Sequence, residues 1–277
     1  MRLIEKSADM AALVGQKPLV LVPTMGALHD GHEALVREAR NLAGRNGTVV
    51  VSIFVNPTQF GPGEDFESYP RELEADREVC ARAGADVVFH PSAEEMYVAG
   101  ASVTVQEADL SQRLCGASRP GHFGGVCTVV TKLFNLVLPD MAVFGKKDYQ
   151  QLAIIRRLVR DLNMGVEIHG LETMREADGL AMSSRNAYLG EEERRQAPAI
   201  RRALLGADTS LDRDTMLGEI SRQLSEEAPL GKIDYLDLVD GSSLERIDTV
   251  DTQPAVLAAA VYFGKTRLID NLEVGGQ

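Results

Sequence analysis

Apolar runs and helical patterns alternate from the N-terminus to about residue 173. Short runs of apolar or β-branched residues, typical of strands buried on both faces, lie at 18–22, 48–55, 86–89, 141–144 and 166–169. Apolar residues at helical spacing predict helices at 3–14, from Glu33 to about Gly44, and at 70–83, 122–138 and 149–162. A short strand is also expected at 102–106. This alternation predicts an α/β fold with a doubly wound parallel sheet.

After about residue 173 the pattern changes. Two helical stretches, at 191–205 and 212–226, precede strands at 233–239, 256–262 and 267–269. Helices first and strands afterwards predict a second, smaller α+β domain. We therefore expect one domain over 1–173 and a C-terminal domain over 174–277.

Polar turns follow several of the predicted parallel strands, at 23–32, 56–60 and 145–148. Ligands of doubly wound sheets bind at the carboxyl ends of the strands. Because these ends meet at one edge of the sheet, the turns together predict a binding site at that edge.

The turn at 23–32 carries the strongest signal. It contains Gly26 and Gly31, and His29 and His32 stand where a helix begins. Backbone N–H groups at a helix N-terminus bind anions, and the imidazoles are additional donors. The alternative is that both histidines only cap the helix.

The formal net charge of −12 disfavours nucleic acid and anionic membrane surfaces as partners, because both require a basic face. It does not exclude a small anion, since global charge is screened over roughly 8 Å at physiological salt. One lysine about 4 Å from a phosphate contributes about 4 kcal/mol at an effective dielectric near 20, before desolvation is counted. The longest nearly apolar run, 255–263, is too short to cross a bilayer.

The cysteines and the N-terminus favour a cytoplasmic location. The first residues mix charges and lack the apolar stretch of a signal peptide. Cys80, Cys115 and Cys127 have no metal-ligand spacing, and we interpret them as reduced thiols in the core. The histidines outside the turn lie in separate elements, so no metal set is expected with His29 and His32.

Other polar residues have both a structural and a functional interpretation. Asn56 and Gln59 would end a strand and cap a turn, or bind a substrate that carries hydroxyls and a carboxylate. Lys146 and Lys147 beside Asp148 would form a solvated cluster or contact a phosphate.

The loop 182–185 (MSSR) would be a plain loop, or would bind a triphosphate through its hydroxyls and guanidinium. The segment 119–122 (RPGH) fits a turn slightly better than a further anion contact. The acids Glu72, Glu74 and Asp76 should mostly form a solvated helix face, although Mg²⁺ beside phosphate oxygens needs only one or two carboxylates.

Several common motifs are absent from the sequence. It contains no Gly-x-x-x-x-Gly-Lys-Ser/Thr loop, no Gly-x-Gly-x-x-Gly in its first strand–helix turn and no Gly-x-Ser-x-Gly elbow. P-loop, nicotinamide and serine-hydrolase functions are therefore disfavoured.

Motifs along nearly the whole chain together resemble the pantothenate synthetase (pantoate–β-alanine ligase) family of the nucleotidyltransferase-like superfamily. They are 23–32 (PTMGALHDGH), 54–60 (FVNPTQF), 144–151 (FGKKDYQQ), 175–186 (READGLAMSSRN) and 265–271 (KTRLIDN). Each motif alone is moderately specific, and all of them in register are very specific.

The resemblance implies a Rossmann-like domain, a small C-terminal lid domain and a homodimer. It implies a ligase that uses ATP with Mg²⁺ to join (R)-pantoate to β-alanine, which yields pantothenate, AMP and pyrophosphate. The carboxylate of pantoate would attack the α-phosphorus of ATP, and the amine of β-alanine would then attack the acyl carbon of an enzyme-bound pantoyl adenylate. Because AMP activates the acyl group, no nucleophilic Ser or Cys is needed.

The resemblance also implies the residues of the site. The ATP-binding residues would be Met25, Gly26, Ala27, Leu28, His29, Asp30, Gly31, His32, Gly145, Lys146, Lys147, Asp148, Met174, Met182, Ser183, Ser184 and Arg185. Of these, His29, His32, Lys147 and Arg185 would be catalytic, with His32 at the position usually assigned as proton donor. The substrate-binding residues would be Gln59, Gln151 and Asn56, with Gln59 also touching β-alanine.

Two positions depart from the family pattern. Lys146 occupies a position that is often acidic in relatives, which predicts a more basic site here. Some relatives bind Mg²⁺ with two adjacent acids, but in this chain Ala75 precedes Asp76. Asp76 is therefore the main candidate for a metal ligand.

Two other functions stay open. A transferase of the same superfamily would keep AMP in its product, and Asn56, Gln59 and Gln151 argue against it because they resemble a pantoate pocket. A regulatory protein would bind the nucleotide without turnover, and the retained histidines, Lys147 and Arg185 argue against that.

Overall fold

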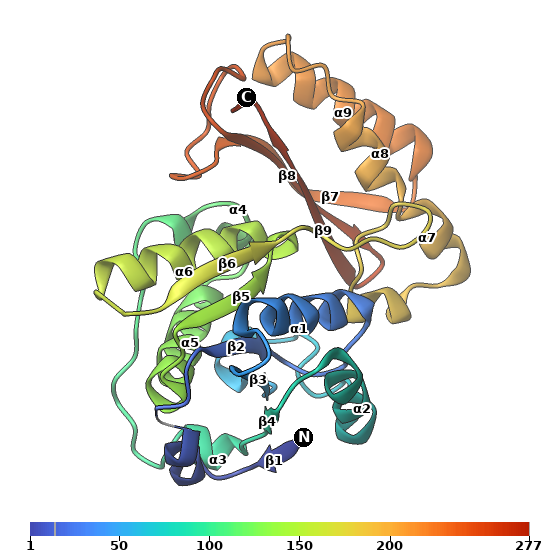
Figure 1. The fold of residues 1–277 in the computed structure, drawn as a ribbon. Coiled ribbons are helices and arrows are strands. Elements are labelled where there is room, and N and C mark those ends of the chain that lie inside the picture. Colours follow the sequence, from blue (N-terminus) through green and yellow to red (C-terminus); the bar gives the residue numbers. More distant parts are fainter. Residues whose placement is uncertain (14, 277) are drawn as a thin grey trace. The chain divides into compact units, whose positions relative to one another are not determined.

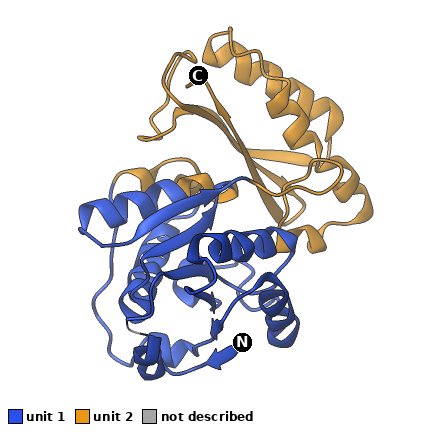
Figure 2. Ribbon diagram, in the orientation of Figure 1, with its two compact units in different colours: residues 1–108, 119–146, 151–172 blue, residues 109–118, 147–150, 173–277 orange. Residues whose placement is uncertain are grey.

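The chain forms two compact units, as seen in a computed structural model that describes residues 1–13 and 15–276. Unit 1 comprises residues 1–108, 119–146 and 151–172, and unit 2 comprises residues 109–118, 147–150 and 173–277 (Figure 2). Two short internal segments, 109–118 and 147–150, thus cluster with the C-terminal part of the chain.

Unit 1 is built on a six-stranded sheet in the order β1-β4-β3-β2-β5-β6, and every pairing is parallel (Figure 1). The strands are β1 Arg2–Ile4, β2 Leu19–Thr24, β3 Thr48–Ile53, β4 Val87–Phe89, β5 Met141–Gly145 and β6 Glu167–Leu171. The prediction of a doubly wound parallel sheet is confirmed.

Helices connect these strands. The α-helices in or entering unit 1 are α1 Asp30–Ala43, α2 Leu73–Ala83, α3 Ala93–Met96, α5 His122–Val137 and α6 Tyr149–Asp161. The shorter 3₁₀ helices are η1 Ser7–Leu13, η2 Pro57–Gln59 and η4 Lys146–Asp148. Since every crossover returns the chain to the same end of the sheet, the loops after the strands collect at one edge.

One face of the sheet is covered by α1 and α2. Alternate strand residues such as Val20, Val22 and Val51 belong to the same buried cluster as Val36 of α1 and Cys80 of α2. This alternation is the period of two that a strand imposes on its side chains. The cluster fixes α1, and with it the turn that leads into α1.

The direction of strand order reverses between β2 and β5. From β2 the chain adds β3 and β4 on one side, and it then returns to place β5 on the other side of β2. A reversal of this kind leaves a crevice at the carboxyl ends of the two strands, where ligands of such sheets bind. The turn before α1 follows β2, and η4 follows β5.

Two predicted elements of unit 1 are wrong. The segment 3–14 is not one helix: residues 2–4 form strand β1, paired with β4, and only Ser7–Leu13 are helical. A short apolar run fits a strand or a helix equally well, and here pairing with the edge of the sheet decides. No strand forms at 102–106 in the described backbone.

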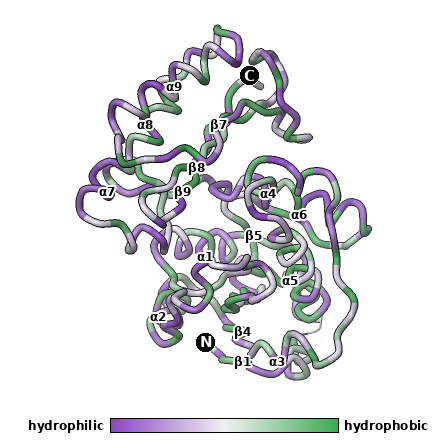
Figure 3. Tube along the Cα trace, turned by 180° about the vertical axis from the view of Figure 1, so that it is seen from behind, coloured by the Kyte–Doolittle hydropathy of each residue, from purple (hydrophilic) through white to green (hydrophobic). Residues whose placement is uncertain are grey.

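Unit 2 has an antiparallel sheet in the order β7-β8-β9 with helices packed against it. Its elements are η3 Leu110–Gln112, α4 Leu114–Ser118, η5 Ser184–Tyr188, α7 Glu191–Gln196, α8 Ala199–Leu205, α9 Arg213–Glu227, β7 Gly231–Asp240, β8 Ala255–Phe263 and β9 Thr266–Val274. Strand β8, mainly hydrophobic in Figure 3, is central and nearly fully buried. A smaller α+β unit, as predicted, is confirmed. The single helix predicted at 191–205 is two, α7 and α8, because Pro198 lies between them.

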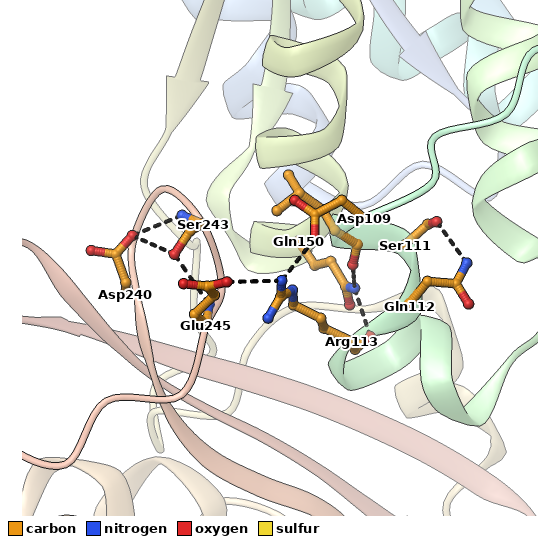
Figure 4. A network of polar contacts seen from close by, with 9 residues as sticks. Asp109, Ser111, Gln112, Arg113, Gln150, Asp240, Ser243 and Glu245 are labelled. Carbon is orange, nitrogen blue, oxygen red and sulfur yellow. Dashed lines mark hydrogen bonds and ion pairs between the residues drawn. The ribbon is translucent and has the colours of Figure 1, made fainter.

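Gln150 ties the two internal segments of unit 2 together (Figure 4). Its buried amide donates through Nε2 to the carbonyls of Leu110 and Arg113, both at 2.7 Å, and accepts from the N–H of Cys115 at 2.9 Å. Arg113 in turn pairs with Glu245 at 3.3 Å. Every hydrogen-bonding atom of this side chain is thereby used within unit 2, which gives Gln150 a structural role.

The three cysteines are buried, unbridged thiols, in agreement with the prediction of core thiols. Burial raises the pKa of Cys80 and of Cys127 to about 12. Both thiols are therefore inert at neutral pH. In the part of the chain that the structure describes, no helix has both the length and the apolar character that a membrane crossing requires.

Candidate active site

The turn at 23–32, here named the histidine turn, is held by a carboxylate from another helix. The backbone N–H of Ala27 donates to Oδ2 of Asp76 at 3.0 Å, and the N–H of Leu28 donates to Oδ1 at 2.7 Å. Gly26 and Ala27 both have positive φ, 83° and 52°. The chain thus bends sharply between β2 and α1, and Asp76 of α2 binds the bend.

Both histidines cap helix α1 through Nδ1. The N–H of Gly31 donates to Nδ1 of His29 at 3.1 Å, and the N–H of His29 donates to Nδ1 of His32 at 3.3 Å. The ring centroids lie 4.1 Å apart. A backbone N–H can only donate, so each Nδ1 accepts and carries no hydrogen. Each neutral imidazole is therefore the Nε2–H tautomer.

The sequence-based choice between capping and anion binding is thus not exclusive. Nδ1 of each ring accepts a capping hydrogen bond, so the ring hydrogen of each neutral imidazole is on Nε2, and an imidazole N–H is a suitable donor to an anion. The amides of residues 27, 28, 29 and 31 already donate within the protein. Backbone N–H groups therefore contribute less to an anion site here than the sequence suggests.

Asp76 is buried, with 2% of its surface exposed, whereas Glu72 and Glu74 are exposed. Burial raises its pKa, and the hydrogen bonds from Leu28 and Ala27 act in the opposite direction. Among the described residues no group of three or more His, Cys, Asp or Glu side chains is arranged to hold a metal ion. Asp76 as a metal ligand stays a prediction.

Asn56 organises the second polar turn, 56–60, here named the amide turn. Its side chain is 1% exposed. Oδ1 accepts from the hydroxyls of Thr58 at 2.9 Å and Tyr97 at 2.7 Å, and Nδ2 donates to Oε1 of Gln59 at 3.0 Å and to the carbonyl of Gly125 at 3.2 Å. Both donors and the acceptor of Asn56 are thereby used within unit 1.

The contact with Asn56 fixes the orientation of the Gln59 amide. Because Oε1 of Gln59 accepts from Asn56, its NH₂ group points the other way and lies 3.0 Å from Sδ of Met25. A thioether is a weak acceptor, so a carboxylate or hydroxyl would readily replace it. This contact also brings the amide turn next to the histidine turn.

Arg119 and His122 fasten the amide turn from the other side. Nδ1 of His122 donates to the carbonyl of Gln59 at 2.8 Å, and the guanidinium of Arg119 donates to Nε2 of the same ring at 3.1 Å. Arg119 also makes a bidentate ion pair with Glu64, at 2.7 and 2.6 Å. Burial alone would raise the pKa of Glu64, but Arg119 outweighs it and brings the pKa to about 2. The segment 119–122 thus has a structural role, in line with the turn that the sequence favoured.

The residues after β5 are divided between the units. In unit 1, Lys146 pairs with the exposed Glu172 at 2.5 Å, and the side chain of Gln151 makes no hydrogen bond within the described chain. In unit 2, the ammonium of Lys147 lies 3.4 Å from Asp148. An amide without an internal partner and a weakly paired ammonium suit ligand binding.

Unit 2 joins the C-terminal motifs to Lys147. Nδ2 of Asn271 donates to the carbonyl of Lys147 at 2.9 Å, and the neighbouring Asp270, 4% exposed, accepts a bidentate pair from Arg175 at 2.7 and 2.9 Å. Next to Arg175, the carbonyl of Met174 accepts from the N–H of Met182 at 2.9 Å. Asp270 and Asn271 of KTRLIDN thus hold two other motifs in place.

The loop 182–185 continues into η5. The hydroxyl of Ser183 accepts from the N–H of Arg185 at 3.3 Å and caps η5. The side chains of Met182, Ser184 and Arg185 are partly exposed. In unit 2, Met182 is thus hydrogen-bonded to Met174, Arg185 to Ser183, and Lys147 to Asn271. The assignment of these residues to the nucleotide rests on the resemblance.

Some residues that shape the site escape sequence reasoning. Tyr97, Arg119 and His122 reach the amide turn from distant parts of the chain, and nothing in the local sequence pairs them with it. Gly125 in α5 is a signal that the sequence does contain. A Cβ there would lie 2.4 Å from the carbonyl oxygen of Thr58, so the glycine allows α5 to approach the amide turn closely. A glycine within a hydrophobic helix indicates such a close approach.

Comparisons with known proteins show the family. The Pantoate-beta-alanine ligase family matches residues 2–273. A pantothenate synthetase from Akkermansia muciniphila is 55% identical over 264 residues, 92% of each chain, and one from Geobacter sulfurreducens is 51% identical over 289 residues, 99% of each chain.

Solved structures give the same result. A pantothenate synthetase from Thermus thermophilus superposes with a TM-score of 0.91 at 46% identity, covering 99% of this chain and 100% of the other. A pantoate-beta-alanine ligase from Francisella tularensis, complexed with beta-gamma ATP and beta-alanine, superposes with a TM-score of 0.81 at 32% identity, covering 100% of both chains.

The fold is that of an α/β protein whose histidine turn follows β2 at the switch point of a parallel sheet, the place where ligands of such sheets bind. The sequence match extends over nearly all of the chain and includes both units. The chain belongs to the pantoate–β-alanine ligase family.

Proposed function

We propose that this chain joins (R)-pantoate to β-alanine with ATP as the energy source and releases pantothenate, AMP and pyrophosphate. The observation that carries the proposal is the family match over residues 2–273, with the predicted motifs intact. The relative from Francisella tularensis, complexed with beta-gamma ATP and beta-alanine, supports the choice of these two substrates.

The first half-reaction activates pantoate. A carboxylate oxygen of pantoate attacks the α-phosphorus of ATP, an O–P bond forms, and the bond to the β-phosphate oxygen breaks. Pyrophosphate leaves with the electron pair of that bond. The attacking carboxylate is already ionised, so no proton has to be removed from the nucleophile, and the protein's task is to align the reactants and to compensate charge on the phosphates.

The second half-reaction forms the amide. The neutral amine of β-alanine attacks the acyl carbon of pantoyl adenylate and a C–N bond forms. The C–O bond to AMP breaks, AMP leaves with its electron pair, and the nitrogen releases one proton to solvent. AMP is a good leaving group at neutral pH. An acyl-enzyme intermediate is unnecessary, which agrees with the inert, buried thiols of Cys80 and Cys127.

In this proposal the histidines serve the phosphates through Nε2–H. Their Nδ1 atoms accept from backbone N–H groups, so Nε2 is the ring atom with a hydrogen to donate to a phosphate oxygen. For His32 as proton donor, the hydrogen involved is likewise the one on Nε2. Lys147 and Arg185 supply positive charge to the departing pyrophosphate, and Ser183 and Ser184 supply hydroxyl donors.

Gln59 and Gln151 bind pantoate. The NH₂ group of Gln59, turned away from Asn56, donates to the carboxylate or a hydroxyl of pantoate in place of its contact with Met25. Gln151 has its amide available within the described chain. Asn56 acts through Gln59, because its own polar atoms are engaged in the protein.

The nucleotide is proposed to bind with Mg²⁺, which would neutralise phosphate charge and needs few ligands from the protein. Both carboxylate oxygens of Asp76 already accept hydrogen bonds, so the phosphates would supply most of the coordination. The resemblance supports a homodimer with a C-terminal lid, and sedimentation of the purified chain tests the dimer. The unbridged cysteines support a cytoplasmic location.

The proposal is tested with the purified protein, ATP, pantoate and labelled pyrophosphate, without β-alanine. We expect pantoate-dependent exchange of the label into ATP, because adenylation is reversible. Added β-alanine should then give equal amounts of pantothenate and AMP. Absence of exchange would refute the ligase, AMP retained in a stable product would indicate a transferase, and nucleotide binding without turnover would indicate a regulatory protein.

A further inference from the structure

The carboxylate of Asp76 fills an anion-binding concavity of its own chain. Successive backbone N–H groups at a turn with left-handed residues form a nest, the kind of site that elsewhere binds phosphate. Here the N–H groups of Ala27 and Leu28 converge on Oδ2 and Oδ1 of Asp76, at 3.0 and 2.7 Å. The two bonds are charge-assisted, and their geometry matches one amide to each oxygen.

The fit between this carboxylate and the turn is close on every side. A Cβ built on Gly26 would lie 2.8 Å from Oδ2 of Asp76 and 3.1 Å from Cγ2 of Ile53. Gly26 therefore has to be glycine for two reasons: its φ of 83° and the space that Asp76 occupies. With 2% exposure, Asp76 has exchanged water for these two amides.

The turn needs such a partner because Ala27 is strained. Its φ of 52° is a left-handed conformation that a residue with a Cβ adopts at a cost, and the surroundings must hold it there. The next residues, His29 and His32, cap α1 and direct their Nε2–H groups. A shift of the turn would therefore move the donors proposed to bind the phosphates.

We propose that Asp76 is a positioning residue for the nucleotide: its carboxylate fixes the histidine turn and thereby places His29 and His32 for phosphate binding. The inference rests on the proposed function for the identity of the ligand. The carboxylate binds the backbone of the turn, so the N–H groups of Ala27 and Leu28 donate to Asp76 and do not donate to the phosphates.

The residues around Asp76 fit this role better than that of a metal ligand. Both oxygens already accept hydrogen bonds, and the described chain has no cluster of three or more candidate ligands. Glu72, four residues before Asp76, is exposed. An ion bound to Asp76 would have to share its oxygens with the two amides.

The test compares Asp76→Asn and Asp76→Glu with the unaltered protein. Asn replaces one acceptor by an NH₂ group that faces an N–H, and Glu keeps the charge but displaces both oxygens by one methylene. We expect hydrogen exchange of the Ala27 and Leu28 amides, followed by NMR, to accelerate at least about tenfold in both variants. Exchange in β3 should not change. The matched control is Glu78→Gln, an exposed acid of the same helix.

Kinetics of the pantoate-dependent exchange reaction provide the second readout. We expect the KM for ATP to rise about tenfold in both Asp76 variants, with the KM for pantoate nearly unchanged, at every Mg²⁺ concentration. If excess Mg²⁺ restored the KM for ATP in Asp76→Asn, and if Asp76→Glu had a normal KM for ATP, Asp76 would be a metal ligand. That result would overturn the proposal. Unchanged amide exchange in both variants would also overturn it.

The two readouts separate this inference from the proposed function. Amide exchange requires no substrate, so it tests the contact of Asp76 with the turn even if the protein has no ligase activity. A protein without pantoate-dependent exchange but with faster amide exchange in the variants would refute the function alone. If Asp76→Asn does not fold, Asp76→Glu decides.

Discussion

Two polar turns at the same sheet edge differ in the groups that hold them. The histidine turn, 23–32, is bound by one buried charge, the carboxylate of Asp76, and by two imidazoles that cap α1. The side chains of the amide turn, 56–60, are fixed by neutral groups, the amide of Asn56 and the hydroxyl of Tyr97. Its charged support, Arg119 paired with Glu64, acts on the backbone carbonyl of Gln59 together with His122. Both turns follow strands of one parallel sheet.

The difference matches what each turn has to bind in the proposed reaction. A hydrogen bond to a charged group contributes about 1.5–3 kcal/mol, against about 0.5–1.5 kcal/mol for a neutral pair. The turn that faces a polyanion needs rigid donors, and a buried carboxylate can organise backbone N–H groups tightly. The turn proposed to bind the carboxylate or a hydroxyl of pantoate needs a fixed amide orientation, which the neutral network around Asn56 provides.

The largest expected effect is from His32→Ala. It removes the Nε2–H donor to the phosphates and the acceptor for the N–H of His29, so adenylation should slow at least ~100-fold while the fold persists. Pantoate-dependent pyrophosphate exchange measures the adenylation rate, and circular dichroism measures whether the fold persists. His169→Ala, in strand β6, is the matched control and should retain its rate. A nearly normal exchange rate in His32→Ala would show that His32 is not the donor to the phosphates.

Asn56→Ala should impair the amide turn in a different way. Without Asn56, Oε1 of Gln59 and the hydroxyl of Tyr97 lose a buried partner, which costs about 1–3 kcal/mol of unfolding free energy for each unsatisfied group. We expect the KM for pantoate to rise about tenfold and the KM for ATP to change little. Denaturant unfolding and steady-state kinetics measure both, with the exposed Asn41→Ala as control. A selective loss of ATP affinity would contradict the division between the turns.

Glu64→Gln tests the charged support of the amide turn through pH. The folded-state pKa of Glu64 is about 2, below its ordinary 4.5, so its stabilisation is complete above pH 4.5 and is lost as pH falls from 4.5 to about 2. The variant should be less stable at neutral pH and should lose less stability across that window. Urea unfolding at several pH values measures this, with the exposed Glu67→Gln as control. Parallel pH profiles in variant and unaltered protein would exclude the contribution of Glu64.

Tyr97→Phe should have the smallest effect. It removes one hydroxyl that donates to Asn56 at 2.7 Å and lies 3.2 Å from Thr58, while Asn56 keeps its other partners. We expect a loss of about 1 kcal/mol in unfolding free energy and a change of less than about threefold in the KM for pantoate. Tyr262→Phe in β8 of unit 2 is the control. A pantoate defect as large as that of Asn56→Ala would place Tyr97 in the substrate pocket.

The sequence predicts strands β2 to β6 of unit 1 well, because each is an apolar run too short for a helix and bounded by polar turns. The run at 48–55 and strand β3, Thr48–Ile53, agree closely. Prediction fails where a short segment has no pattern of its own. Leu3 and Ile4 become a strand only because β4 offers an edge to pair with.

For the site, the motifs give the residue types and the tertiary structure gives their tasks. The sequence offers capping and anion binding as alternatives for His29 and His32, and the hydrogen bonds show that one nitrogen of each ring already serves the cap. It groups Asp76 with Glu72 and Glu74 as a mostly solvated face, but only Asp76 is buried. The sequence of α2 does not show which element the helix packs against, and that packing decides that Asp76 is buried while Glu72 and Glu74 are exposed.

The sequence by itself determined the family, the parallel sheet and the edge at which the polar turns collect, because apolar period and motif order are local properties of the chain. Only the tertiary structure decided which polar atoms remain available for a ligand. Asp76 comes to Ala27, Tyr97 to Asn56 and Asn271 to Lys147 over long stretches of sequence. Such partners are chosen by packing of whole elements, and a hydrogen bond depends on distances of tenths of an ångström that no local pattern encodes.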